Sequence, residues 1–171
     1  MDISATVTGL EPLNIDEVKN YLKIDFDEDD LLLNDMITGA REQAEQFTGL
    51  SLVEKTIVLF ETEYDYEIEL PYPEHDEVTK VEINGEDYTN NIQVIGNKEK
   101  TVILPVIYDS SSTGDGVEIT YTTTGVCPKP IKNALLKNIA DWYENRANIS
   151  EVSGQMISEN TIAILTRYMK L

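Results

Sequence analysis

The chain has 171 residues, of which 41% are hydrophobic, so it can bury a core as one domain or as two small ones. Its formal net charge of -19 argues against a nucleic-acid-binding surface, which needs Lys and Arg to displace counterions from phosphates. The single Cys excludes an internal disulfide and a multi-thiolate zinc site, and the single His leaves no His cluster for a metal site.

Two helices are predicted in the first fifty residues. Asn14 can cap a short amphipathic helix, with Glu17 at the position that completes a capping box. A longer helix follows the acidic stretch DFDEDDLLLND (residues 25–35), where Asp27 or Asp29 can cap it, and Gly49 supplies a left-handed end. Arg41, Glu42 and Glu45 lie off the apolar stripe of this helix, which consists of Leu33, Met36, Ile37, Ala40, Ala44 and Phe47.

The acidic stretch matches a calcium-binding EF-hand loop only in part. A loop that begins at Asp25 has acids at its first, third and fifth positions. Its sixth position is Asp30, where a Gly must allow a sharp turn, and its twelfth is Met36, where a Glu must close the coordination shell. An acidic calcium-dependent binding module therefore stays only as an alternative, and we predict no metal site and no cofactor.

The middle of the chain predicts a small antiparallel sheet. The stretch ETEYDYEIEL (residues 61–70) alternates apolar and acidic residues, which is typical of a half-buried strand or hairpin with an acidic face. The pair Asn84-Gly85 predicts a tight hairpin turn, because both residues tolerate positive φ. Residues 100–105 (KTVILP) and 116–124 (GVEITYTTT) predict two further strands.

The pattern becomes helical again after Gly125. Pro128 and Pro130 begin a helix whose apolar stripe is Ile131, Leu135, Ile139 and Trp142. Ser158 can cap a last short helix with a stripe of Ile162, Leu165 and Met169, and a helix of this length must dock on its own domain or on a partner. Residues 129–171 contain 4 acidic and 6 basic residues, against 28 and 7 in residues 1–128, so the docking segment differs in charge from the rest.

No motif in the sequence predicts an enzyme. Phosphate-binding loops, nucleophile elbows and dinucleotide fingerprints are absent, and the acids between residues 61 and 77 are expected on a solvated face. His75 is expected to be an exposed turn residue, and Cys127 a half-buried small residue. We therefore predict no catalytic residues. The sequence also has no apolar run of the ~20 residues that span a bilayer and no signal peptide, so we expect no membrane contact and a cytoplasmic protein.

Two ordered motifs resemble a known family. LNIDEVKNYLKID followed by DEDDLLLNDMITGAREQAEQFTG resembles the opening of the head–tail connector (adaptor) proteins of long-tailed bacteriophages, with Glu45, Thr48 and Gly49 in the first family signature. YTTTGVCPKPIKNALLKNIADWYENR resembles their strand, glycine turn and proline-capped helix, and matches the ending of that helix at Trp142, Tyr143, Glu144 and Arg146. The sheet between these motifs resembles the longer branch of the family, which carries a β insertion. The chain departs from the family in its acidity and in GVCPKP, where the family more often has GY.

The resemblance implies an α+β fold in which N- and C-terminal helices form a helical bundle and a small antiparallel β domain is inserted. The expected boundaries are 1–52 for the N-terminal helical hairpin, 53–126 for the β insertion and 127–171 for the C-terminal helices with a portal-docking segment. It also implies a homo-oligomeric ring, commonly dodecameric, that is assembled in the host cytoplasm on the portal protein and located in the virion neck. Such a ring conducts genomic DNA without binding it specifically and carries a stopper or tail-completion protein.

These expectations assign two groups of surface residues. The predicted portal or subunit interface is Trp142, Tyr143, Arg146, Ile162, Leu165, Arg167, Tyr168 and Met169. Trp142 is also consistent with a core position, because it continues an apolar stripe. The acids predicted to face the channel are Glu61, Glu63, Asp65, Glu67 and Glu69. The alternative within viruses is another neck component, a stopper or tail-completion protein, which would bind a preformed adaptor instead of the portal.

Overall fold

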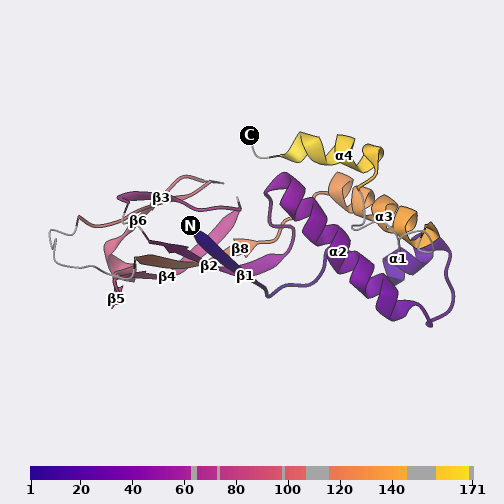
Figure 1. Cartoon of the computed structure of the whole chain (residues 1–171), viewed down its shortest axis with the longest axis horizontal. Helices are drawn as coiled ribbons and strands as arrows, with labels where there is room; N and C mark the ends of the chain where they lie inside the picture. The colour runs from indigo at the N-terminus through magenta and orange to yellow at the C-terminus, as the bar shows by residue number, and fades with distance from the viewer. Residues whose placement is uncertain (63–64, 73, 98, 107–115, 146–156, 170–171) are drawn as a thin grey trace. The chain divides into compact units, whose positions relative to one another are not determined.

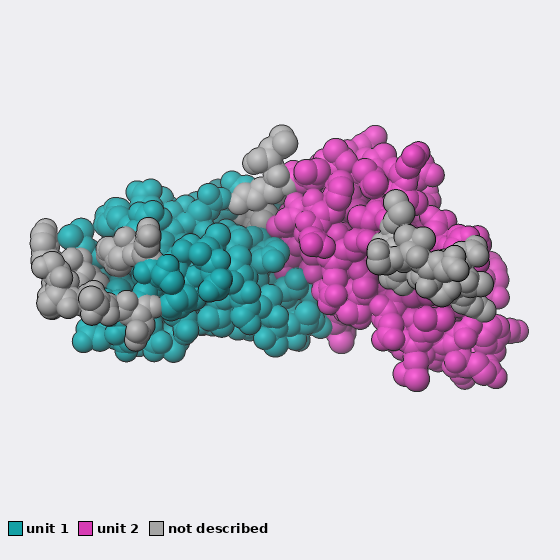
Figure 2. Space-filling model, viewed as in Figure 1, with its two compact units in different colours: residues 1–9, 53–126 teal, residues 10–52, 127–171 magenta. Residues whose placement is uncertain are grey.

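The computed structural model describes residues 1–62, 65–72, 74–97, 99–106, 116–145 and 157–169. The chain forms two compact units of different composition, one built of strands and one of helices (Figure 1). Unit 1 contains residues 1–9 and 53–126, and unit 2 contains residues 10–52 and 127–171 (Figure 2). The predicted α+β fold class is confirmed, since helices from both ends of the chain share one unit and antiparallel strands form the other.

Unit 2 is a bundle of helices around one apolar core. Its helices are α1 (Ile15–Leu22), α2 (Asp30–Thr48), α3 (Lys129–Glu144) and α4 (Glu159–Leu165), and α4 continues into the 3-10 turn η3 (Thr166–Tyr168). The core includes the predicted stripes of α2 and α3, and its buried members are Leu13, Val18, Leu33, Met36, Ile37, Ala40, Ala44, Leu52, Ile131, Leu135, Ile139, Trp142 and Leu165. No helix within the described residues is both long and apolar enough to cross a membrane.

The helix ends follow the local chemistry that the sequence predicts, with one exception. The Asn14 side chain accepts a hydrogen bond from the Glu17 amide at 2.8 Å, and the Glu17 carboxylate accepts one from the Asn14 amide at 3.0 Å. Gly49 ends α2 with φ 73°. Asp29 is the N-cap residue of α2, but its side chain makes no capping hydrogen bond, so the predicted side-chain cap is wrong.

Unit 1 consists of two antiparallel sheets. The larger has the order β1-β2-β8-β4-β5, and its strands are β1 (Asp2–Val7), β2 (Glu54–Glu61), β8 (Val117–Thr124), β4 (His75–Ile83) and β5 (Glu86–Asp87). The smaller has the order β3-β7-β6, and its strands are β3 (Glu67–Glu69), β7 (Thr101–Ile103) and β6 (Gln93–Ile95). The 3-10 turn η1 (Thr89–Asn91) joins β5 to β6. The sequence patterns predict neither β1 nor β6.

The two sheets share one core, to which each contributes alternate residues. The buried members are Ile57, Leu59, Ile68, Leu70, Val81, Ile83, Val102, Leu104, Val117, Ile119 and Tyr121. The predicted hairpin is confirmed, because Asn84 and Gly85 have φ 55° and 82° between the paired strands β4 and β5.

His75 is buried, with 6% of its surface exposed, so the expectation of an exposed turn residue is wrong. It begins β4, and its Nε2 lies 2.9 Å from the Pro71 carbonyl oxygen. The Tyr121 hydroxyl donates to the same oxygen at 2.7 Å, and the two rings meet edge to face with 5.4 Å between centroids. These contacts hold Pro71 and His75 on the core of unit 1.

Candidate functional site

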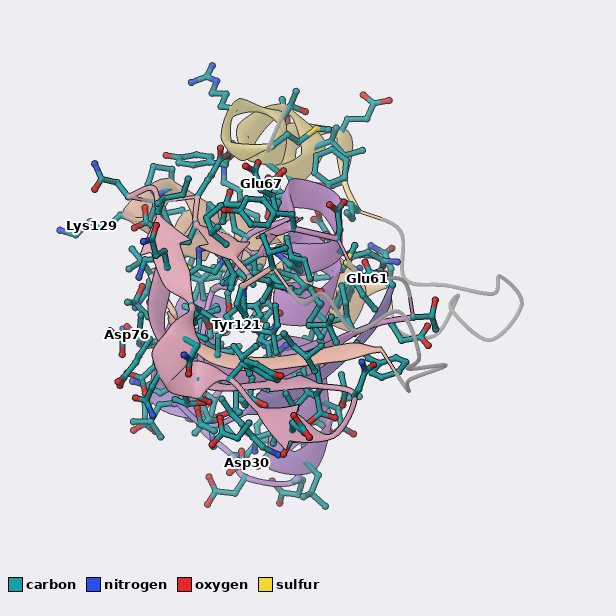
Figure 3. All side chains as sticks on the ribbon, turned by 90° about the vertical axis from the view of Figure 1, so that its left-hand side faces the viewer. Asp30, Glu61, Glu67, Asp76, Tyr121 and Lys129 are labelled. Atoms are coloured by element: carbon teal, nitrogen blue, oxygen red, sulfur yellow. The ribbon has the colours of Figure 1, made fainter. Side chains whose placement is uncertain are left out.

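The acids predicted to face a channel do not form one continuous strand. Glu61 ends β2 in the larger sheet, where its carboxylate lies 3.1 Å from the N-terminal amine, whereas Glu67 belongs to β3 in the smaller sheet (Figure 3). Asp65, Glu67 and Glu69 are exposed, and Glu63 lies outside the described residues. The prediction of a single strand or hairpin over 61–70 is therefore wrong, because β2 and β3 pair with other strands and belong to different sheets.

The acids of residues 25–35 are partly engaged inside unit 2. Lys19 Nζ donates to Asp27 at 2.5 Å and to Asp30 at 2.8 Å, and these hydrogen bonds raise the pKa of the lysine. The Tyr143 hydroxyl donates to Asp29 Oδ2 at 2.5 Å and so connects the end of α3 to the start of α2. Within the described part of the chain, no group of three or more acids, His or Cys is arranged to hold a metal ion.

A buried ionic network that sequence reasoning missed surrounds Arg41. Only 3% of its surface is exposed, and its guanidinium donates to both oxygens of Glu11, at 3.0 and 3.1 Å, and to Glu45 Oε2 at 2.9 Å. The other oxygen of Glu45 accepts from the Leu52 amide at 2.7 Å. Burial disfavours the charged guanidinium, but the hydrogen bonds to Glu11 and Glu45 outweigh that cost and raise its pKa.

This network ties the segment before α1 and the segment after α2 to the middle of α2. The helical spacing placed Arg41 and Glu45 outside the apolar stripe, and the structure buries both. The available signal was their i,i+4 spacing, which suits an ion pair, together with the family signature that contains Glu45. Glu45 of this signature is therefore part of a structural ionic network.

The predicted interface residues divide into buried and exposed groups. Trp142 is a member of the unit 2 core with 4% of its surface exposed, and Tyr143 is half-buried. Arg146 lies outside the described residues. In the C-terminal segment Leu165 is buried and Tyr168 packs against the core, whereas Ile162, Arg167 and Met169 are exposed.

The predicted stripe of α4 is therefore only partly correct. Leu165 faces the core together with Thr161, whose hydroxyl donates to the Ala134 carbonyl oxygen at 3.4 Å. Ile162 is 38% exposed and Met169 is 42% exposed, so these two residues lie on the outer side of the segment. The chain's own helices α2 and α3 supply the surface on which α4 docks.

A second group of exposed apolar residues lies at the turn between α1 and α2. Leu31 is 83% exposed, Phe26 is 42% exposed and Tyr21 is 47% exposed. Leu31 and Leu32 precede the buried Leu33, and in the sequence they already fall outside the apolar stripe, which was the available signal. These exposed apolar side chains lie at the end of α1, in the turn and at the start of α2, and exposed apolar groups of this kind are candidates for a contact surface.

An open hollow of about 550 Å³ lies in unit 2 between the 10–17 segment, α2 and Lys132. Its two carboxylates already have structural partners, since Glu11 holds Arg41 and Glu17 completes the α1 cap. Cys127, in the same unit, is half-buried as predicted, and burial raises the pKa of its thiol to about 11. The two carboxylates therefore have structural roles, and the raised pKa makes the Cys127 thiol a weak nucleophile at neutral pH.

Comparisons with known proteins show which family and which solved structures the chain is similar to. A family model described as head completion protein matches residues 12–167. No curated protein matches the chain. Among solved structures, the chain is similar to a protein in the neck of an empty gene transfer agent particle, computed with C6 symmetry, with TM-score 0.72 and 17% identity over 98% of this chain and 96% of that chain.

Two further structures of such particles are similar. The neck of the native particle, computed with C12 symmetry, gives TM-score 0.72 and 17% identity over 98% of this chain and 96% of that chain. The virion of the native particle gives TM-score 0.73 and 16% identity over 98% and 95%. At such identities these likenesses show a shared fold along nearly the whole chain.

Proposed function

Because the chain belongs to the head completion protein family, we propose that it is a structural head–tail connector (adaptor) of a tailed phage or phage-like particle. It forms a ring on the portal vertex, in the virion neck, after assembly in the host cytoplasm. The ring conducts genomic DNA to the tail and carries the next neck protein, a stopper or tail-completion protein. The observation that carries this proposal is the family match over residues 12–167.

The shared fold with neck proteins supports the ring. Two of the similar structures are necks computed with C6 and C12 symmetry, and a twelve-fold arrangement is the copy number that we propose for this chain. A heterologous contact that is repeated by rotation closes into such a ring. The exposed outer side of the C-terminal segment, with Ile162, Arg167 and Met169, is proposed as contact surface for the portal or a neighbouring copy.

The negative charge of unit 1 supports a channel wall along which DNA passes without being bound. Unit 1 contains 17 acidic and 4 basic residues. We propose that Asp65, Glu67 and Glu69, which are exposed, face the channel together with Glu61 and Glu63. Like charges would then repel the DNA backbone and keep it mobile during passage.

Negative-stain imaging of the portal ring from the same genome, with and without this protein, tests the proposal. An added coaxial layer on the portal is the expected result. If no layer forms when both proteins are folded and the portal is intact, the adaptor function is wrong. The stopper or tail-completion function would then be tested by adding the protein to portal rings that already carry their adaptor.

A further inference from the structure

The turn between α1 and α2 exposes an apolar surface that nothing in unit 2 covers within the described residues. This turn patch consists of Tyr21, Phe26, Leu31 and Leu32, with exposed fractions of 47%, 42%, 83% and 37%. The patch is small and is surrounded by charge, as in protein contacts with an apolar centre and a polar rim.

The charges around the turn patch are mostly negative, and Lys23 is the one exposed base among residues 20–35. Asp25, Glu28 and Asp35 are exposed, and they form no ion pair within the described part of the chain. Asp27 and Asp30 share Lys19 and are thus partly neutralised. A surface that fits the turn patch therefore combines apolar side chains with positive charge.

The same unit carries such a surface on another part of its helices. We call it the basic face; it consists of Lys129 at the start of α3 and of Arg167 and Met169 after α4. All three residues are exposed, and neither Lys129 nor Arg167 forms an ion pair among the described residues. The basic face is thus complementary to the turn patch in both charge and apolar character.

The helices hold the two surfaces at opposite ends of α3. The hydrogen bond from Tyr143 to Asp29 places the turn patch beside the end of α3. The α4 segment runs antiparallel to α3, because Ser158 meets Asn138 and Thr161 meets Ala134, so it carries Arg167 toward the start of α3 (Figure 1). The 16 residues of α3 separate the two ends by about 24 Å at 1.5 Å per residue.

We propose that the turn patch of one copy docks on the basic face of a second copy. Because the two surfaces lie at opposite ends of one helix, they do not meet within a chain, and the contact is heterologous. Repeated around an axis, it adds one copy to the next and closes as a ring. The proposal rests on the proposed ring function and names the surfaces that would form it.

Charge reversal tests the contact. The acidic-end variant carries Asp25→Lys and Glu28→Lys, the basic-end variant carries Lys129→Glu and Arg167→Glu, and a third variant carries all four changes. All four side chains are exposed, so each variant should fold, which circular dichroism and thermal melting verify. The full chain is titrated onto portal rings, and layer formation is scored by negative-stain imaging.

Each two-residue variant is expected to need at least about tenfold more protein for half-maximal layer formation. The four-residue variant, in which both surfaces are reversed, is expected to return to within about threefold of the original chain. A matched control, Asp76→Lys with Glu77→Lys, makes the same charge change on exposed residues of unit 1 that are not assigned to the channel, and should leave layer formation unchanged. Normal assembly of the acidic-end variant, or failure of the folded four-residue variant, would overturn the proposal.

The apolar part of the contact is tested by Leu31→Ser. This change should raise the concentration for half-maximal layer formation about fivefold or more, because it removes an apolar side chain from the centre of the contact. Leu10→Ser is the matched control, since Leu10 is 94% exposed in the same unit but lies outside the turn patch. Equal effects of the two substitutions would overturn the docking role of the turn patch.

Zero-length carbodiimide cross-linking of the full chain at high concentration detects the contact between the turn patch and the basic face in the absence of the portal. In a mixture of isotope-labelled and unlabelled protein, cross-linked peptides should join Asp25 or Glu28 of one copy to Lys129 of another. Lys129→Arg keeps the charge and should remove this cross-link. Exclusive cross-links within one copy, or to portal lysines when the portal is added, would overturn the proposal. Intermolecular cross-links without any layer on the portal would instead contradict the proposed adaptor function.

Discussion

Unit 1 contains 17 acidic and 4 basic residues and unit 2 contains 15 and 9, and the two units are stabilised in different ways. Unit 1 depends on pairing between distant strands, such as β1 with β2 and β2 with β8, around a core in which Tyr121 and His75 contact one carbonyl oxygen. Unit 2 depends on local helices with their caps and on the ionic network of the buried Arg41 and Glu45 with the partly exposed Glu11. Unit 1 therefore keeps its excess of acids on the surface of its sheets. Unit 2 instead uses an ion pair within its core.

The largest effect is expected when the buried network of unit 2 is broken. Arg41→Leu removes the partner of the buried Glu45 carboxylate and should lower the free energy of unfolding of unit 2 by about 3–5 kcal/mol. The chain has one Trp, Trp142, in the core of unit 2, so urea unfolding followed by tryptophan fluorescence reports on that unit. Glu42→Gln, an exposed change on the same helix, should stay within about 0.5 kcal/mol. A loss below about 1 kcal/mol for Arg41→Leu would contradict the stabilising role of the network.

The next effect concerns the strand pairing of unit 1. Gly116 precedes β8 with φ 100°, and a Cβ at this position would lie 2.1 Å from the Glu61 carbonyl oxygen. Gly116→Ala should therefore cost more than about 2 kcal/mol of unit 1 stability, measured by hydrogen exchange of the β8 amides. Gly85→Ala is the control, because φ is 82° there but no atom lies within 4 Å, and its cost should stay near about 1 kcal/mol. Equal costs at both glycines would show that crowding against β2 is unimportant.

The two units should lose stability in the same direction at alkaline pH. Burial raises the pKa of Tyr121 in unit 1, and it raises the pKa of Cys127 in unit 2 from 9.0 to about 11. Because each group keeps its proton more tightly in the folded state, this stability is complete below the unfolded pKa and is lost as the pH rises through the folded pKa.

For Cys127 that interval is pH 9 to about 11, and the loss should be about 1–2 kcal/mol after allowance for its partial exposure. Urea midpoints from Trp142 fluorescence at pH 8 and pH 10.5 measure this loss. Cys127→Ala should reduce the fall in the urea midpoint of unit 2 between these two pH values. If the urea midpoint of this variant falls between pH 8 and pH 10.5 as much as that of the original chain, the loss of stability comes from other groups.

The smallest effect is expected at the first helix cap. Asn14→Ala removes the hydrogen bond to the Glu17 amide and should cost unit 2 about 1 kcal/mol in the same fluorescence assay. Asn20→Ala on the exposed side of α1 is the control and should change stability by less than about 0.5 kcal/mol. If the two substitutions have the same effect, the capping box does not stabilise the bundle.

Local chemistry explains which parts of the fold the sequence predicts. The cap at Asn14, the end at Gly49, the Asn84-Gly85 turn and the α3 stripe each depend on residues close together in the chain, and all are confirmed. Strand β1 depends instead on Ile57 and Leu59, more than fifty residues away, and its own residues are exposed, so period-two burial gives no signal there.

The same reasoning explains what was missed at the surfaces. Glu11 becomes a partner of Arg41 only when the segment before α1 lies across the middle of α2. The two residues are thirty positions apart in the sequence. The turn patch was visible as leucines outside a stripe, but its exposure depends on which side of α2 the other helices cover. Tertiary packing, and not helical spacing, decides both the partner of Arg41 and the exposure of the turn patch.

The order of the segments along the chain has a consequence for synthesis on the ribosome. Unit 1 opens with residues 1–9, is interrupted by residues 10–52 and resumes at residue 53, while unit 2 is completed only by residues 127–171. The apolar stripe of α2 therefore leaves the exit tunnel long before α3 exists to cover it, and β1 must wait for β2. Neither unit can finish folding before most of the chain is translated, and no single proteolytic cut can release one unit from the other.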